Sequence, residues 1–336
     1  MCTLVILRRP GHAWPVLIGA NRDEMIDRES KPPGRHWPDR PEVVAGLDVL
    51  AGGSWLGVND WGVAAAVLND SSKVKFVPLN SQQRFTSLQA GEVDVLSRNS
   101  TWTLTRDASL GILFTGINYF DGQGFMVPKK LNIANAKKMN GATVCVQAGT
   151  TSEKNVADYF GANNMKYKPV VFDTAEAITS AFFAGRCQVY TTDMSDLAGA
   201  RTKAPKPDDY TILPQVISKE PLGPSVRRGD DEWFEIVRWT LFAMLEAEED
   251  GLTQANVDAQ KATSKDPGVQ RFLGVSEDTG KLLGLDAQWA YRIVKAVGNY
   301  GESFERNLGP KSPVGLPRGV NNLWTKGGLM YAMPAR

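Results

Sequence analysis

The stretch that decides the fold reads LQAGEVDVL at residues 88–96 and continues as NSTWTLTRD at residues 99–107. Its first half predicts the end of a helix over 82–90, followed by a strand over 93–96. An apolar run over 74–79 predicts another strand before that helix. A strand, a helix and a second strand in this order are typical of the βαβ unit of a parallel sheet.

The same alternation repeats further along the chain, and it predicts an α/β fold. The predicted strands lie at 143–147, 170–172 and 188–192, and the predicted helices between them lie at 152–160 and 175–184. Beyond residue 230 the chain is mainly helical. Apolar residues over 232–249 are mostly spaced three or four apart, and a shorter helix is predicted over 287–298.

The composition excludes several classes of function. The chain has 336 residues, of which 42% are hydrophobic and 22% charged, and a net charge of +1, so nothing indicates nucleic acid or an anionic membrane as partner. No stretch approaches the roughly 18 continuous apolar residues of a membrane span. Only four apolar residues, at 4–7, precede Arg8 and Arg9, so we expect no signal peptide. We also expect no metal and no cofactor.

Several motifs follow one another in a fixed order. NSTWTLTRD leads to FTGINYF at 114–120, and then come VCVQAGTT at 144–151, GRCQVYTTD at 185–193 and KEPLGP at 219–224. In content and order they resemble the solute-binding proteins of polar amino-acid ABC transporters. Two C-terminal runs, at 296–304 and 324–336, resemble the general L-amino-acid-binding branch of that family. The resemblance covers about residues 70–336.

The resemblance implies a receptor and not an enzyme, with the two-lobe α/β fold of type II periplasmic binding proteins. It assigns 70–120 and 221–336 to a partial first lobe and 121–220 to a second lobe. It further implies an L-amino acid as ligand, the membrane subunits of an ABC importer as partner, and a monomeric protein.

A free amino acid is a zwitterion, so its receptor needs a cation for the carboxylate and an anion for the ammonium. The resemblance places the ligand-binding residues at Asn99, Thr101, Arg106, Thr150, Thr151 and Asp193. Arg106 can hold a carboxylate through two parallel hydrogen bonds, and Thr150 and Thr151 precede a helix whose N-terminus favours an anion. Asp193, at the end of a predicted strand, can hold the ammonium. Taken singly, such residues are more often a solvated arginine, a helix cap and a turn residue.

The chain has three cysteines, Cys2, Cys145 and Cys187. Their number alone is typical of reduced thiols in a cytosolic protein. Cys145 and Cys187, however, belong to two predicted strand segments of the second lobe, and neighbouring strands can bring two cysteines within bonding range. We therefore predict a disulfide between them, which implies the periplasm although we expect no signal peptide.

The resemblance to solute-binding proteins does not extend to the first 69 residues. They predict short strands at 3–7 and 16–20 and a turn at 52–53. The start MCT, NRDE at 21–24 and GGSWLGVN at 52–59 resemble the NRDE family, which is related to the transport-and-Golgi-organisation proteins. That family is similar in outline to N-terminal-nucleophile hydrolases, so a β-rich fragment of that fold is implied.

The NRDE resemblance implies an alternative function. In a cysteine hydrolase of this type Cys2 would be the nucleophile, with Arg22 and Asp23 as its candidate partners. The simpler interpretation is that Cys2 is only a small residue in a first strand. Because the resemblance ends near Asn69, we expect this active site to be incomplete.

Residues 63–69, VAAAVLN, fit both resemblances, as a strand or the start of a helix. We hypothesise that two genes are joined at this shared stretch. The strand that normally lies in the middle of the first lobe's sheet would then be missing. Because buried unpaired backbone groups are costly, we expect a loose first lobe and weak affinity unless residues 1–69 fill the gap. A third interpretation is a chimera without a working site.

Overall fold

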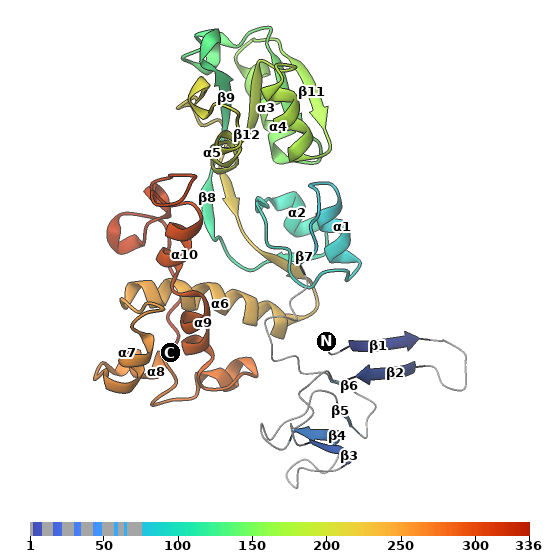
Figure 1. The fold of residues 1–336 in the computed structure, drawn as a ribbon, viewed down its shortest axis with the longest axis vertical. Coiled ribbons are helices and arrows are strands. Elements are labelled where there is room, and N and C mark those ends of the chain that lie inside the picture. Colours follow the sequence, from blue (N-terminus) through green and yellow to red (C-terminus); the bar gives the residue numbers. More distant parts are fainter. Residues whose placement is uncertain are drawn as a thin grey trace. The chain divides into compact units, whose positions relative to one another are not determined.

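The computed structural model describes residues 76–336 in full and, within residues 1–75, only the backbone of six strands (Figure 1). The chain divides into two compact units, Met1–Val77 and Pro78–Arg336. The sequence motifs that carry the predicted ligand residues lie in the second unit, which therefore contains the candidate site.

The described strands of the first unit form two antiparallel sheets. In one, β1 (Thr3–Arg8) pairs with β2 (Val16–Asn21), which confirms the strands predicted at 3–7 and 16–20. The other has the order β3-β4-β5-β6, with the bounds Ser30–Gly34, Val43–Asp48, Gly57–Asn59 and Ala64–Ala65. The predicted turn at 52–53 lies outside the described residues, and the hydrolase-like fold remains a prediction.

A five-stranded sheet forms the second lobe, with the order β11-β10-β12-β9-β13 (Figure 1). The strands are β9 (Gln123–Pro128), β10 (Thr143–Gln147), β11 (Lys168–Phe172), β12 (Val189–Asp193) and β13 (Tyr210–Ile212). Strand β10 is parallel to both of its neighbours, β11 and β12, whereas β9 is antiparallel to β12 and β13. The helices are α3 (Thr151–Ala162), α4 (Ala175–Phe183) and α5 (Met194–Thr202). The predicted alternation of strands and helices in this region is therefore confirmed.

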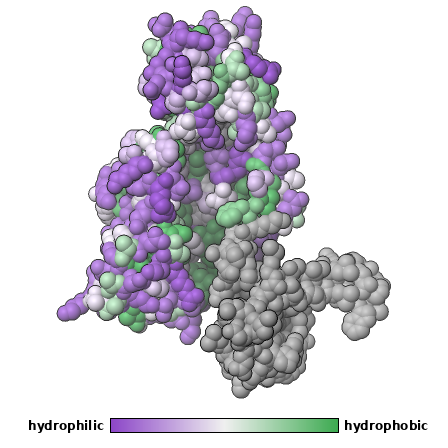
Figure 2. Space-filling model, viewed as in Figure 1, coloured by the Kyte–Doolittle hydropathy of each residue, from purple (hydrophilic) through white to green (hydrophobic). Residues whose placement is uncertain are grey.

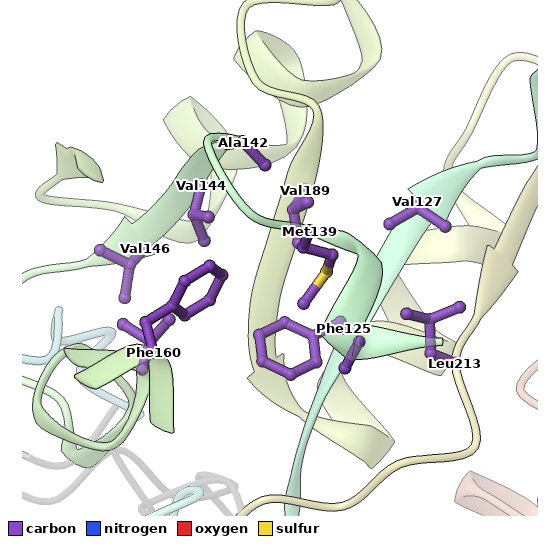
Figure 3. Close-up of a cluster of buried hydrophobic side chains, with 11 residues drawn as sticks. Phe125, Val127, Met139, Ala142, Val144, Val146, Phe160, Val189 and Leu213 are labelled. Atoms are coloured by element: carbon purple, nitrogen blue, oxygen red, sulfur yellow. The ribbon is translucent and has the colours of Figure 1, made fainter. Parts of the chain in front are cut away.

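Both faces of this sheet are buried, which explains the continuous apolar run of β10. Successive side chains of a strand point to opposite faces, so Val144 and Val146 pack with Phe160 of α3 on one face (Figure 3). Cys145 points to the other face, where it packs with Phe182 of α4. Burying each large apolar side chain contributes about 1.5–3 kcal/mol.

Cys145 and Cys187 form a disulfide, with their Cα atoms 5.7 Å apart. Cys187 lies two residues before β12, beside Cys145 on the neighbouring β10. The predicted pairing is thus confirmed. It ties together the two strands whose C-terminal ends carry the candidate ligand residues.

Two strands cross between the lobes, β8 (Tyr119–Asp121) and β14 (Glu220–Leu222), and they pair with each other in antiparallel fashion. The lobe boundaries expected after residues 120 and 220 fall within this ribbon. Next to it, β7 (Ile112–Phe114) pairs with β15 (Ser225–Arg227). The two crossing segments approach so closely that a Cβ on Gly223 would lie 2.0 Å from the carbonyl oxygen of Gly116.

The remainder of the first lobe departs from two predictions. Helix α1 (Gln83–Gln89) is present as expected and is followed by α2 (Leu104–Ser109). The strand predicted over 93–96 is wrong, because only Leu96 forms a β-bridge, with Ser225. Within the strand predicted over 74–79, the described residues 76–79 are irregular.

Side chains explain both departures. The Nη1 atom of Arg227 donates to the carbonyl oxygen of Val93 at 2.6 Å, and its Nη2 donates to the carboxylate of Asp94 at 3.0 Å. The guanidinium of Arg227 thus makes hydrogen bonds to this segment that a neighbouring strand would otherwise make. Further upstream, Pro78 has no N–H to donate to a sheet, and the carbonyl of Leu79 accepts from Arg98 Nη1 at 2.5 Å.

The C-terminal part of the chain is helical and begins with the long α6 (Asp231–Glu249), which buries Leu241, Ala243, Leu245 and Ala247. The other helices are α7 (Val257–Thr263), α8 (Pro267–Phe272), α9 (Trp289–Val297) and α10 (Tyr300–Asn307). Short 3-10 helices lie at Lys129–Leu131, Ala136–Lys138, Pro207–Asp209, Thr279–Leu283, Gly319–Asn321 and Trp324–Lys326. The helices predicted over 232–249 and 287–298 are confirmed.

The visible surface of the second lobe, at the top of the view, is mainly hydrophilic (Figure 2). Within the part of the chain that the structure describes, no helix is both long and apolar enough to cross a membrane.

Candidate functional site

A small cavity lies where the two lobes meet, and it gathers five of the six predicted ligand residues. Its volume is about 10 Å³, roughly the minimum that can hold a single water molecule. The predicted residues that line it are Asn99 and Thr101 from the first lobe and Thr150, Thr151 and Asp193 from the second.

Asn99 and Thr101 reach the second lobe from the irregular segment that follows Leu96. The side-chain amide of Asn99 donates to Asp196 Oδ2 at 2.5 Å, and it lies 3.5 Å from Asp193 Oδ2. The hydroxyl oxygens of Thr101 and Thr151 are 3.4 Å apart. These contacts hold the lobes together in the geometry seen here.

Thr150 and Thr151 occupy the start of α3, as the sequence predicts, but their hydroxyls have different tasks. Thr150 is the N-cap, because its hydroxyl accepts from the backbone N–H of Glu153 at 3.3 Å and donates to the carbonyl of Gln147 at 2.7 Å. The hydroxyl of Thr151 instead points across to the carboxylate of Glu220 at 2.9 Å.

Asp193 ends β12 at the carboxyl edge of the sheet and is 4% exposed. Burial raises the pKa of its carboxyl well above the usual range, and the charges of Asp196, Asp121 and Glu220 raise it further. The amide of Asn99 acts in the opposite direction. A cation placed beside this carboxyl would therefore strongly favour the ionised carboxylate.

Arg106, the sixth predicted residue, lies in α2 and does not line the small cavity. Its Nη1 donates to the carbonyl of Thr101 at 2.9 Å, and its guanidinium carbon lies 5.0 Å from the centre of the Phe85 ring. Burial lowers the pKa of Arg106, while the charges of Glu220 and Asp193 partly restore it. A role in carboxylate binding remains a prediction.

Two further charged residues of the site escaped the sequence reasoning, and the first is Arg84 of α1. It lines the cavity, is 2% exposed and has no hydrogen-bond partner for Nε among the described residues. Its guanidinium carbon lies 4.9 Å from the same Phe85 ring that Arg106 approaches. Burial lowers the pKa of Arg84 to about 9, and the neighbouring Arg106 and Arg98 add to the effect. A signal was present, because Arg84 is four residues from Leu88 and therefore shares its buried face.

The second is Glu220, which begins β14 and is 2% exposed. Its carboxylate accepts from residues of both lobes and of the crossing segment, namely Thr101, Thr151, Asn155 and Ser218. No comparable signal marks Glu220 as a site residue, since it stands in a loop-like run of charged residues, proline and glycine.

Comparison with known proteins shows the family to which the chain belongs. Residues 60–254 match the model of the bacterial extracellular solute-binding proteins, family 3. The chain belongs to this family. The first 90 residues also match the model described as Transport and Golgi organisation 2. The two matches overlap over 60–90, a range that includes the shared stretch at 63–69, so the boundary expected after residue 69 remains a prediction.

Close relatives of this family 3 protein are named as amino-acid-binding proteins. The general L-amino acid-binding periplasmic protein AapJ of Rhizobium johnstonii is 54% identical over 291 residues, covering 85% of each chain. The glutamate/glutamine/aspartate/asparagine-binding protein BztA of Rhodobacter capsulatus is 52% identical, covering 89% of this chain and 86% of its own.

A solved structure agrees with the fold. A periplasmic binding protein of an ABC transporter from Brucella ovis, determined with glutathione bound, is 51% identical and has a TM-score of 0.78. The match covers 84% of this chain and 92% of the other. The two-lobe type II architecture is therefore shown for the second unit.

Proposed function

We propose that this protein is the substrate-binding component of an ABC importer for L-amino acids, and that it binds the zwitterion between its two lobes. One observation carries the proposal. Asp193, from the second lobe, and Arg84, from the first, are buried at one cavity without a salt bridge to each other. Buried charges need partners, and a ligand bearing both an ammonium and a carboxylate supplies one to each.

Binding requires the lobes to separate. The cavity holds about 10 Å³, which is too small for any amino acid. The lobes are connected by β8 and β14, a single antiparallel ribbon of three-residue strands that can act as a hinge. We expect the ligand to enter an opened cleft and to replace direct contacts between the lobes, such as that of Asn99 with Asp196.

The relatives support the location and the partner. AapJ is named a periplasmic protein, and it and BztA are named for the binding of amino acids. The disulfide between Cys145 and Cys187 fits an oxidising compartment. On this basis the protein acts in the periplasm, delivers its ligand to the importer's membrane subunits, and works as a monomer.

Thermal melting against each of the twenty L-amino acids tests the proposal. A ligand at a hundredfold excess over its Kd stabilises the native state by about 2.7 kcal/mol. At roughly 2–4 °C per kcal/mol, the melting temperature should rise by several degrees. Arg84→Ala and Asp193→Ala should abolish the rise, while Arg292→Ala, at an exposed position of α9, should leave it intact. A cooperative melt that no amino acid shifts would overturn the proposal.

The match of residues 1–90 to the Transport and Golgi organisation 2 model favours a second candidate, a cysteine hydrolase. Its residues Cys2, Arg22 and Asp23 lie outside the described residues. Mass spectrometry provides the test, because such a hydrolase must lose Met1 and its Cys2 must be alkylated by a mechanism-based amide reagent. A protein that retains Met1 would rule the hydrolase out.

A further inference from the structure

Glu220 lies where both lobes and the crossing ribbon meet. Its Oε1 accepts from Asn155 Nδ2 of α3 at 2.7 Å and from Ser218 Oγ, two residues earlier in the chain, at 2.5 Å. Its Oε2 accepts from the hydroxyl of Thr101 in the first lobe and from that of Thr151 in the second. The carboxylate is thus anchored through one oxygen and presents the other to two threonines that line the cavity.

This arrangement fixes the direction of both threonine hydroxyls. A hydroxyl has one proton to donate and two lone pairs that accept. Thr101 and Thr151 each donate their hydroxyl proton to Glu220 Oε2. No proton therefore lies between their own hydroxyl oxygens, which are 3.4 Å apart. Toward the cavity, both oxygens can therefore act only as acceptors.

Thr150 provides an internal comparison. Its hydroxyl also donates its proton, to Gln147, and accepts from the N–H of Glu153. Its proton and one of its two lone pairs are thus used within the second lobe. The hydroxyls of Thr101 and Thr151, by contrast, give their protons to Glu220 and keep lone pairs free toward the cavity, which Asp193 also lines.

We propose that Glu220 is a positioning residue that turns the hydroxyls of Thr101 and Thr151 into acceptors for the ligand's ammonium. The inference rests on the proposed function. The ammonium end then lies toward Asp193 and the two threonines, and the carboxylate end toward the guanidinium of Arg84 or Arg106. A carboxylate cannot take the place of the ammonium, because it has no proton for these acceptors and would face the charge of Glu220.

With its acceptors oriented in this way, the site selects the amine of an amino acid over the hydroxyl of the corresponding 2-hydroxy acid. A 2-hydroxy acid has the same shape, but it carries one donor proton where the ammonium carries three. Two oriented acceptors and Asp193 can be satisfied together by an ammonium and not by a hydroxyl. A glutamine at position 220 would offer N–H donors to the threonines, so their hydroxyls could turn and donate into the cavity.

Isothermal titration calorimetry on the full-length protein tests this, with two matched pairs of probes, L-glutamate with (S)-2-hydroxyglutarate and L-alanine with L-lactate. The measured quantity is the ratio of the Kd of the hydroxy acid to the Kd of the amino acid. In Glu220→Gln the ratio should fall at least tenfold. Thr101→Val and Thr151→Val should lower it as well, and adding Thr101→Val to Glu220→Gln should lower it little further.

Two controls separate positioning from general damage. Glu220→Asp, which keeps a carboxylate, should restore part of the ratio, and Glu92→Gln, at an exposed turn, should leave it unchanged. If Glu220→Gln weakens both members of a pair equally, its role is structural and the inference is wrong. Should Glu220→Gln fail to fold, an unchanged ratio in both threonine variants overturns the inference equally. A wild-type protein that binds neither L-glutamate, L-alanine nor any other amino acid would instead refute the proposed function.

Discussion

Reduction of the disulfide between Cys145 and Cys187 should destabilise the second lobe by a predictable amount. The two cysteines are separated by 42 positions, and closing a loop of this length removes entropy from the unfolded chain worth about 4 kcal/mol. Both residues are buried, so the reduced thiols should remain packed and the native state should change little. At roughly 2–4 °C per kcal/mol, the melting temperature should fall by roughly 8–16 °C.

Differential scanning calorimetry with and without a phosphine reductant measures this effect. A Cys2→Ser background leaves a single pair of cysteines and prevents exchange with the third thiol. The double variant Cys145→Ala/Cys187→Ala should melt near the reduced protein, apart from the small cost of the lost sulfur atoms. A shift below about 2 °C would refute the reasoning, because it would mean that the unfolded chain gains almost no freedom on reduction.

Three other predictions follow from buried groups. Burial raises the pKa of Asp193 above its unfolded value, so the ligand-free protein should lose stability as the pH rises from about 4 through the raised pKa. In that same pH range, binding of an ammonium ligand should release the proton of the Asp193 carboxyl, so the ligand should bind more tightly at higher pH. Calorimetric titrations in two buffers of different ionisation enthalpy that give equal heats would contradict this. Phe160→Ala, in the core of the second lobe, should cost about 3–5 kcal/mol in urea unfolding, and a loss below 1 kcal/mol would indicate a core that collapses freely. Glu248→Ala leaves the mostly buried Arg318 without its bidentate partner and should cost about 3–5 kcal/mol in the same assay. Asp258→Ala, which removes an exposed partner of Lys295, should destabilise the protein far less, and equal losses would contradict the difference in burial.

The second lobe was the part most readily predicted from sequence. Its strands are short apolar runs bounded by turns and separated by capped helices, and both sheet faces are covered. Local pattern and tertiary environment therefore agree there. The strand predicted over 93–96 failed for the opposite reason. Its residues favour a strand, but the guanidinium of Arg227, 133 positions beyond Asp94, takes over the hydrogen bonding of this segment.

Some residues of the candidate site could likewise be predicted from the sequence, and others could not. Thr150 and Thr151 precede a helix and Asp193 ends a strand of the same sheet, and the carboxyl ends of parallel strands meet at one edge, so their convergence could be expected. Asn99 and Thr101 were found only through the resemblance, because the strand predicted before them is absent. Glu220 could not be found in this way. Its importance depends on four donors from three separate segments, and no sequence pattern encodes such a meeting.

The sequence by itself determined the family, the α/β alternation, the disulfide partners and half of the residues that line the cavity. These depend on local periodicity and on motifs whose order is visible in one dimension. The tertiary structure alone decided that Arg84 is buried, that Arg106 lies outside the cavity, and that Glu220 directs two hydroxyls. The reason is physical. Burial and the direction of a proton are set by all the neighbours of a group, and folding brings those neighbours from distant parts of the chain.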